Sequence, residues 1–261
     1  MTVSKIPFLA PRNHNEEKKM KKALLCLLAA AVLAPCAMAN SLQVTDAAPL
    51  MEGNFYLSVD HIGGSSLAYV QDLTPDDEPV FRGEFLYRFR DLAFPNNNQA
   101  NFRQVIYVAF GLNPNPNVGE CSGLMFAESF RIFHTQTFGG QVSGLQAWGR
   151  GRQCGPRNSG APILISGPNG VDTDGDGIVR VCFQLTTPDT TAEDGIMSLG
   201  AVNQDLPCGD AAFQDRALAN GTMSGPGDAR LATPQANGFG LGETATFDFD
   251  SYASFRTTQA Q

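Results

Sequence analysis

The chain has 261 residues, of which 43% are hydrophobic and 17% are charged, and its formal net charge at pH 7 is −8. A chain of this length and composition can bury a core of its own. Its acidity argues against nucleic acid or anionic lipid as the main partner, because like charges repel.

Residues 20–39 have the three parts of a secretory signal peptide. Two lysines follow Met20, an apolar run occupies residues 23–33, and small residues stand before the expected cleavage point at Asn40. We therefore expect residues 1–39 to be an N-terminal extension plus signal peptide, with the true start at Met20, and the protein to be secreted or periplasmic. The alternative is a lipoprotein anchored at Cys36, although proline directly before this cysteine fits the motif poorly.

Removal of residues 1–39 would change the charge of the chain. Residues 40–261 contain 24 acids, 12 arginines and no lysine, which is a net charge of −12. Such a surface suits neutral ligands and divalent cations. The apolar run of the leader is too short to cross a bilayer and no later stretch is long enough, so we expect no membrane span.

The pattern of residues 40–261 predicts one all-β domain. Residues 81–90 alternate strictly, with Phe81, Phe85, Tyr87 and Phe89 on one face and charged side chains on the other. Residues 104–112 are apolar throughout, which predicts a strand covered on both faces. Residues 203–242 are rich in Gly, Ala, Asp and Pro, and we expect loops there with one short helix near residues 211–219. Further strands are expected at residues 55–59, 124–133, 145–153, 163–166, 178–185 and 244–256.

Four cysteines follow the leader, and an even number in an oxidising compartment predicts two disulfides. They are Cys121, Cys154, Cys182 and Cys208. Three pairings are possible, and we expect the pairing of sequence neighbours, Cys121–Cys154 and Cys182–Cys208. A zinc site is the alternative, but the chain has no Cys-x-x-Cys motif to support it.

The sharpest local motif is the run Asp172-Thr-Asp174-Gly-Asp176-Gly, which matches the first half of a calcium loop. Alternate aspartates in a tight loop direct their oxygens at one centre, and the backbone of Ile178 would supply the next ligand. A complete EF-hand is excluded, because Phe183 stands where the bidentate acid belongs. We expect a Ca²⁺ ion here, and the alternative is a solvated Asp/Gly hairpin without metal.

Signals for ligand binding and catalysis are few. Trp148 could stack on a sugar ring, and Arg150 and Arg152 could grip an acidic polysaccharide; the alternative is a core tryptophan with solvated arginines. Asp248 and Asp250 share a strand face, a spacing typical of the wet side of a strand. We expect the two histidines that follow the leader, His61 and His134, to occupy surface or turn positions, and no serine-hydrolase or paired-glutamate motif occurs. We therefore expect no enzyme.

Four segments resemble the concanavalin A-like lectin/glucanase jelly rolls, particularly the LamG-like group. They are residues 52–59, 68–75, 81–89 and 246–256, the last with a Phe-Asp pair followed by Ser-Phe-Arg. The resemblance implies two antiparallel sheets of six or seven strands, packed face to face as a β-sandwich with long loops. Members include glycan binders, glycosidases and structural modules, so the fold does not decide the function.

Three functions are consistent with these observations. We expect a non-catalytic, exported β-sandwich that binds a carbohydrate or cell-surface polymer and holds a structural calcium. The first alternative is a structural envelope or matrix protein without a ligand. The second is a polysaccharide-active hydrolase with an unrecognised site.

Overall fold

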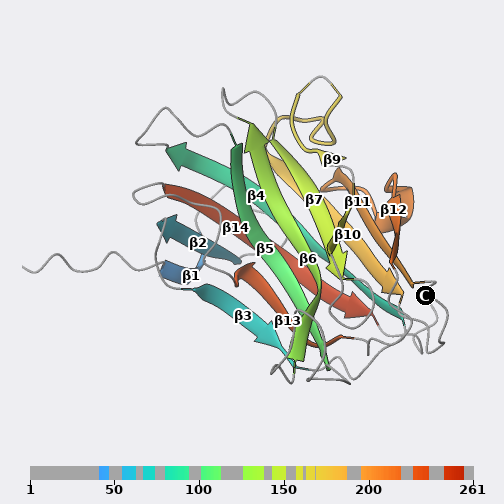
Figure 1. Ribbon diagram of the computed structural model, residues 1–261. Coiled ribbons are helices and arrows are strands. Elements are labelled where there is room, and N and C mark those ends of the chain that lie inside the picture. Colours follow the sequence, from blue (N-terminus) through green and yellow to red (C-terminus); the bar gives the residue numbers. More distant parts are fainter. Residues whose placement is uncertain are drawn as a thin grey trace, which may run out of the picture. The chain divides into compact units, whose positions relative to one another are not determined.

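Two antiparallel sheets pack face to face to form a β-sandwich (Figure 1). The computed structural model describes residues 41–46, 55–62, 67–73, 80–93, 101–112, 126–137, 143–150, 157–160, 163–167, 169–186, 195–218, 226–234 and 244–255. All of them belong to one compact unit that spans Ala39–Gln261. The expected leader lies outside the described residues.

The described strands divide into two sheets. Sheet A has the order β1 (Ser41–Thr45), β2 (Tyr56–Ile62), β14 (Thr244–Phe255), β4 (Val80–Ala93), β10 (Ile178–Thr186), β11 (Gly195–Asn203) and β12 (Gln214–Leu218). Sheet B has the order β3 (Ala68–Asp72), β13 (Pro226–Thr233), β5 (Asn101–Leu112), β6 (Phe126–Thr137), β7 (Ser143–Arg150) and β8 (Arg157–Ser159), with β9 (Ile163–Leu164) also paired to β7. The prediction of an all-β sandwich is confirmed.

The core between the sheets is aromatic, and the alternation of β4 places its rings there as expected. Phe85 of β4 is fully buried and lies 6.0 Å, centroid to centroid, from Phe249 of β14. From sheet B, Tyr107 of β5 packs 4.6 Å from Phe183 of β10. A side chain at Gly83 would collide with the ring of Phe183, so glycine at this position makes room for the aromatic contact.

Strand β5 is covered on both faces, which confirms the reading of its continuous apolar run. Tyr107 and Ala109 face the core, whereas Val105 and Val108 join a second buried cluster with Phe133 of β6 on the opposite face of sheet B. A register shift against β6 between Val105 and Tyr107 allows this arrangement, because it turns the strand between the two residues.

The expected helix and loops between residues 203 and 242 are partly wrong. Residues 214–218 form the edge strand β12, preceded by a single short 3-10 turn, η2 (Cys208–Asp210). Residues 226–233 form β13, which lies between the edge strand β3 and β5 in sheet B and pairs with both. Cross-strand hydrogen bonds and burial of Ala229 and Leu231 override the weak β-propensity of this segment. No helix among the described residues is long and apolar enough to cross a membrane.

Candidate functional site

The outer face of sheet B, directed away from the core, carries arginines and aromatic rings from five adjacent strands. Alternation along each strand places every second side chain there. We call this surface the arginine–aromatic face and define it by Tyr69, Arg103, Phe110, Arg131, Phe133, Gln146, Trp148, Asp228 and Arg230.

Two arginines share two rings at one end of this face. The Arg103 guanidinium lies 4.7 Å from the centroid of the Trp148 ring and 5.2 Å from that of Phe133. The Arg131 guanidinium lies 4.8 and 4.5 Å from the same two centroids. Arg103 also donates a hydrogen bond of 3.1 Å to Gln146 Oε1, which fixes its direction.

A third arginine repeats the pattern at the other end of the face. The Arg230 guanidinium lies 4.9 Å from the centroid of Tyr69 and 4.7 Å from that of Phe110. Its Nη2 atom lies 2.7 Å from Asp228 Oδ2. This hydrogen bond raises the pKa of Arg230, so the guanidinium is permanently charged.

The arrangement suits an anionic, ring-shaped ligand. Aromatic rings hold each guanidinium in place. Arg131 is only 3% exposed and Arg230 is paired with Asp228, so half-buried Arg103 is the guanidinium placed to meet a carboxylate, the partner that guanidinium matches best. The rings themselves offer flat apolar surface. Trp148 Nε1 is buried and has no hydrogen-bond partner among the described residues.

Only one of the predicted ligand residues has a described side chain. Trp148 is half-buried on the arginine–aromatic face. Its burial is thus intermediate between the two alternatives from the sequence, an exposed sugar-binding ring and a core tryptophan. The backbone of Arg150 pairs with Arg157, but its side chain and all of Arg152 lie outside the described residues. The sequence did not lead us to Arg103, Arg131 and Arg230. Each lies in a strand beside residues that face the core, so the alternation of polar and apolar residues is the pattern that could have revealed them.

The predicted calcium loop does bring its aspartates together. Asp172, Asp174 and Asp176 offer carboxylate oxygens that all lie within 4.8 Å of one another. Gly175 and Gly177 have φ values of 80° and 81°, a region that favours glycine and allows the tight bends.

Backbone and amide N–H groups already satisfy several of the oxygens in this loop. Asp172 accepts hydrogen bonds from the N–H groups of Gly175 and Gly177, at 2.9 and 3.2 Å. Asn203 donates to Asp174 at 3.1 Å and lowers the pKa of that carboxyl, whereas burial raises the pKa of Asp172. The N–H of Ile178, the fourth expected ligand residue, donates to Asp176 at 2.8 Å. The calcium ion therefore stays a prediction.

One expected disulfide is present. Cys182 of β10 and Cys208 of η2 are bonded, with their Cα atoms 5.7 Å apart. The bond fastens the segment before β12 to the outer face of sheet A. The other expected pair, Cys121 and Cys154, lies outside the described residues.

One carboxylate that we expected on the wet side of a strand is buried instead. Asp248 is fully buried on β14, where it lies 2.7 Å from Arg88 Nη2 and 2.8 Å from Arg90 Nε, so the prediction of a wet strand face is wrong at this position. Burial alone would raise the pKa of Asp248, but hydrogen bonds from Arg90, Ser58 and Arg88 outweigh it and lower the pKa.

The histidines also lie inside. His61 is 2% exposed, and burial lowers its pKa to about 4. His134 is fully buried; its Nδ1 atom is 2.9 Å from Tyr87 Oη and its Nε2 atom is 3.0 Å from Ser143 Oγ. Both imidazoles pack near the ring of Phe247, so the prediction of surface or turn positions is wrong for both.

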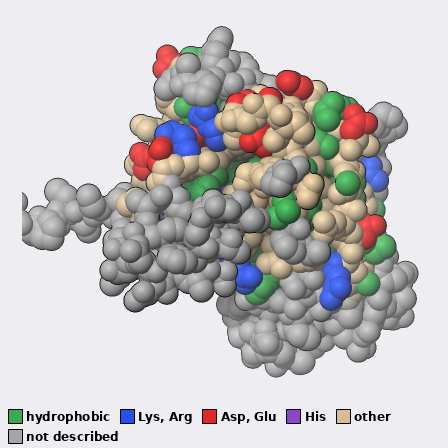
Figure 2. All heavy atoms as spheres, turned by 90° about the horizontal axis from the view of Figure 1, so that it is seen from above, with side chains coloured by type: hydrophobic (Ala, Val, Ile, Leu, Met, Phe, Trp, Pro, Cys, Tyr) green, Lys and Arg blue, Asp and Glu red, His purple; other side chains and the backbone are tan. Residues whose placement is uncertain are grey.

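Opposite charges lie close together on the described surface (Figure 2). Arg90 contacts exposed Asp91 at 2.7 Å, and Arg180 lies 3.2 Å from Glu84. The arginines are thus distributed among acids, and their effect on a ligand depends on which of them lack a carboxylate partner.

No protein-family model matches the chain, and no curated protein matches it by sequence. Among solved structures it is similar to the alginate lyase Aly36B in complex with an alginate tetrasaccharide, at 11% identity and a TM-score of 0.49, over 79% of this chain and 82% of that one. It is also similar to the alginate lyase of Aplysia kurodai, at 8% identity and a TM-score of 0.49, over 83% and 87% of the two chains. A carbohydrate esterase of the Shiga toxin-encoding bacteriophage phi24B matches at 6% identity and a TM-score of 0.45, over 81% and 87%.

These likenesses concern the fold alone. The matched structures include several alginate lyases and a carbohydrate esterase, so they lend no support to our expectation that the chain is not an enzyme, and that expectation is withdrawn. The lectin-type resemblance is supported only at the level of the jelly-roll sandwich.

Proposed function

We propose that the protein is a polysaccharide-active enzyme that binds an acidic polysaccharide on the arginine–aromatic face. The observation that carries this proposal is the placement of three arginines, each over two aromatic rings, on one outer face of the sandwich. The two arginine clusters lie on five neighbouring strands of sheet B, namely β3, β13, β5, β6 and β7. Five adjacent strands span roughly 19 Å at the usual inter-strand spacing, which is long enough for several sugar rings.

The charges of the face select a sugar that carries a carboxylate. Arg103 meets Gln146 through a neutral hydrogen bond, so its positive charge is available to a ligand, whereas Arg230 already has Asp228 as a partner. A guanidinium held over a ring binds a carboxylate with two parallel hydrogen bonds and fixes its orientation. The rest of residues 40–261 is strongly acidic, and an anionic polymer would therefore be directed to this face and repelled elsewhere.

The same groups favour cleavage by elimination. When a guanidinium neutralises the carboxylate of a uronate, the neighbouring C5 proton becomes easier to remove. A base takes that proton, a double bond forms between C4 and C5, and the C4–O bond breaks with its oxygen taking up a proton. Among the described residues of the face, Tyr69 and Asp228 are the groups able to transfer protons, and Arg230 lies against both.

Export and calcium complete the proposal. Secretion or periplasmic residence follows from the leader, and it agrees with the Cys182–Cys208 disulfide, since such bonds persist in oxidising compartments. A Ca²⁺ ion in the 172–177 loop would stabilise the turn beside β10 and take no part in the reaction.

The test is to incubate the purified protein with alginate or polygalacturonate, and separately with neutral glucans. We expect retention by the two acidic polymers in affinity electrophoresis, together with new unsaturated ends that absorb in the ultraviolet. Arg103→Gln should weaken retention about tenfold, the loss typical of one charge-assisted contact, while Arg216→Gln on the exposed edge strand β12 makes the same charge change and should not. Equal retention by neutral glucans, or an unaffected Arg103→Gln variant, would contradict the proposal for this face.

A further inference from the structure

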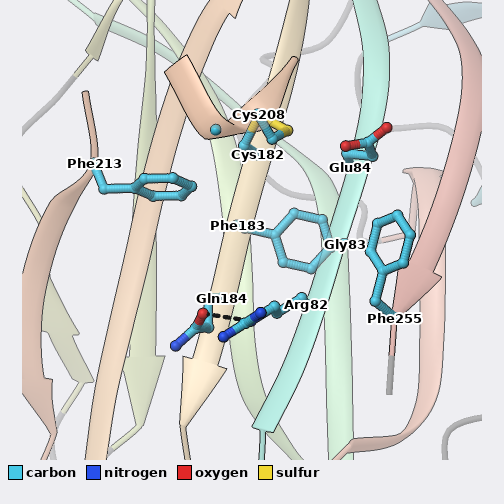
Figure 3. A pocket seen from close by; sticks show the side chains of 10 residues that line it. Arg82, Gly83, Glu84, Cys182, Phe183, Gln184, Cys208, Phe213 and Phe255 are labelled. Atoms are coloured by element: carbon cyan, nitrogen blue, oxygen red, sulfur yellow. Dashed lines mark hydrogen bonds between the residues drawn. A yellow bond between two sulfur atoms is a disulfide. The ribbon is translucent and has the colours of Figure 1, made fainter. Parts of the chain in front are cut away.

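A pocket lies on the outer face of sheet A, on the side of the sandwich opposite to the arginine–aromatic face (Figure 3). It encloses about 170 Å³. Phe213 and Phe255 stand on its two sides, the Cys182–Cys208 disulfide bounds one end, and Arg82 and Gln184 bound the other (Figure 3).

The sequence builds this pocket through small residues and a fixed loop. A side chain at Gly200 of β11 would collide with Ala211 and Phe213, so glycine at this position lets residues 211–213 lie over sheet A. The preceding residues 204–208 are held by the disulfide and by Arg180, which donates hydrogen bonds of 3.1 and 3.0 Å to the carbonyl oxygens of Leu206 and Gln204. The walls are therefore fixed before any ligand arrives.

The charge inside the pocket is unbalanced. Glu84 lines the pocket as well, but its carboxylate is paired with Arg180 at 3.2 Å. Arg82 is exposed and donates its Nε–H to the neutral Gln184 Oε1 at 2.7 Å, and it meets no carboxylate among the described residues. One positive charge is therefore left for a ligand in an otherwise acidic protein.

The apolar walls define the rest of the ligand. Phe213 is 44% exposed although it is a large hydrophobic side chain, and it faces the half-buried Phe255 across the opening. A closed apolar cavity of about 150 Å³ holds one benzene molecule. The pocket, at about 170 Å³, is thus large enough for one six-membered ring.

We propose that this pocket binds a small molecule or chain end that consists of one six-membered ring with one carboxylate. The carboxylate meets the guanidinium of Arg82, and the ring lies between Phe213 and Phe255. Such a ring has two sources, an aromatic acid or a uronic acid residue, and both share this chemistry. The site is separate from the polysaccharide face, because it lies on the other sheet and uses none of its residues.

Isothermal titration calorimetry of the purified protein tests the proposal with four probes. They are benzoate and galacturonate, each beside its neutral counterpart, benzamide and galactose. We expect at least one acid to bind about tenfold more tightly than its neutral counterpart, and the acid that binds identifies the source. If neither acid is preferred, the proposal is wrong.

Variants then show whether the acid binds in this pocket. Arg82→Gln keeps the hydrogen bond to Gln184 and removes the charge, so it should abolish the preference for the acid, and Phe213→Ala should weaken binding of the ring itself. The control Arg216→Gln should bind the acid as the native protein does. Arg103→Gln, which affects the opposite face, should also bind it unchanged; loss of binding in that variant, with Arg82→Gln unaffected, would overturn the assignment.

Discussion

At the scale of single residues, the ion cluster around Asp248 shows how the outer face of sheet A is held together. The fully buried carboxylate neutralises buried Arg88 and half-buried Arg90 and accepts a 2.7 Å hydrogen bond from Ser58 Oγ. An isosteric amide would leave the Arg88 charge buried without a carboxylate.

We therefore predict that Asp248→Asn lowers the free energy of unfolding by about 3–5 kcal/mol. Because the native pKa of Asp248 lies below its unfolded value, the stabilisation is present above the unfolded pKa, near 4, and is lost as the pH falls through the native pKa. Urea unfolding at pH 7 measures the difference. Asp215→Asn, at an exposed position on β12, should change stability by no more than about 0.5 kcal/mol. Similar losses in both variants would contradict the role of the cluster.

His61 predicts a second, separate pH effect. Burial lowers its pKa to about 4, whereas an unfolded histidine titrates near 6.5. The native state thus binds this proton less readily, and stability should fall by up to about 3 kcal/mol as the pH drops from 6.5 to 4. His61→Gln should flatten the stability profile over this window, as measured by denaturant unfolding at several pH values. An unchanged slope in the variant would show that His61 does not cause the effect.

At the scale of elements, the disulfide ties η2 to β10 and thereby positions Phe213. Its two cysteines are 26 residues apart. A closed loop of this length stabilises the fold by about 3–4 kcal/mol in the chain-entropy model. The double change Cys182→Ala and Cys208→Ala should lower stability by this amount and increase hydrogen exchange at residues 204–213. Unchanged exchange there would mean that Arg180 alone holds the segment.

The 172–177 loop is the second element with a measurable function. Three carboxylates within 4.8 Å repel one another, so a divalent cation should stabilise the native loop. Calcium should raise the thermal midpoint by mass action, and excess chelator should reverse the rise. The double variant Asp174→Ala and Asp176→Ala should lose the response, whereas Asp205→Ala should keep it. No shift at millimolar calcium would leave the loop as a hairpin stabilised by its own N–H groups.

At the scale of the whole molecule, the sequence predicted which side chains face the core of the sandwich better than it predicted which strands are neighbours within each sheet. Alternation in β4 placed Phe85 and Tyr87 in the core, because period-two patterns follow directly from strand geometry. The place of β13 between β3 and β5 was not predictable, since this pairing depends on residues far away along the chain.

The same limit explains which site residues were found. Trp148 was named from its own segment, but the arginines that stack on it come from β5 and β6, and their meeting is a property of strand order. The convergence of the three aspartates was predicted because their carboxylates lie within one turn. Local motifs are therefore visible in the sequence, whereas a binding face assembled from five strands appears only in the fold.

The most direct test of the account compares two arginine variants that lie on opposite sheets. Retention by polymeric alginate, which presents few chain ends to the Arg82 pocket, is measured by affinity electrophoresis for the native protein, Arg103→Gln and Arg82→Gln, which make the same change in charge. We predict a loss of about tenfold for Arg103→Gln and little change for Arg82→Gln, because the polymer occupies the arginine–aromatic face of sheet B. Equal losses in both variants, or a loss only in Arg82→Gln, would contradict the account.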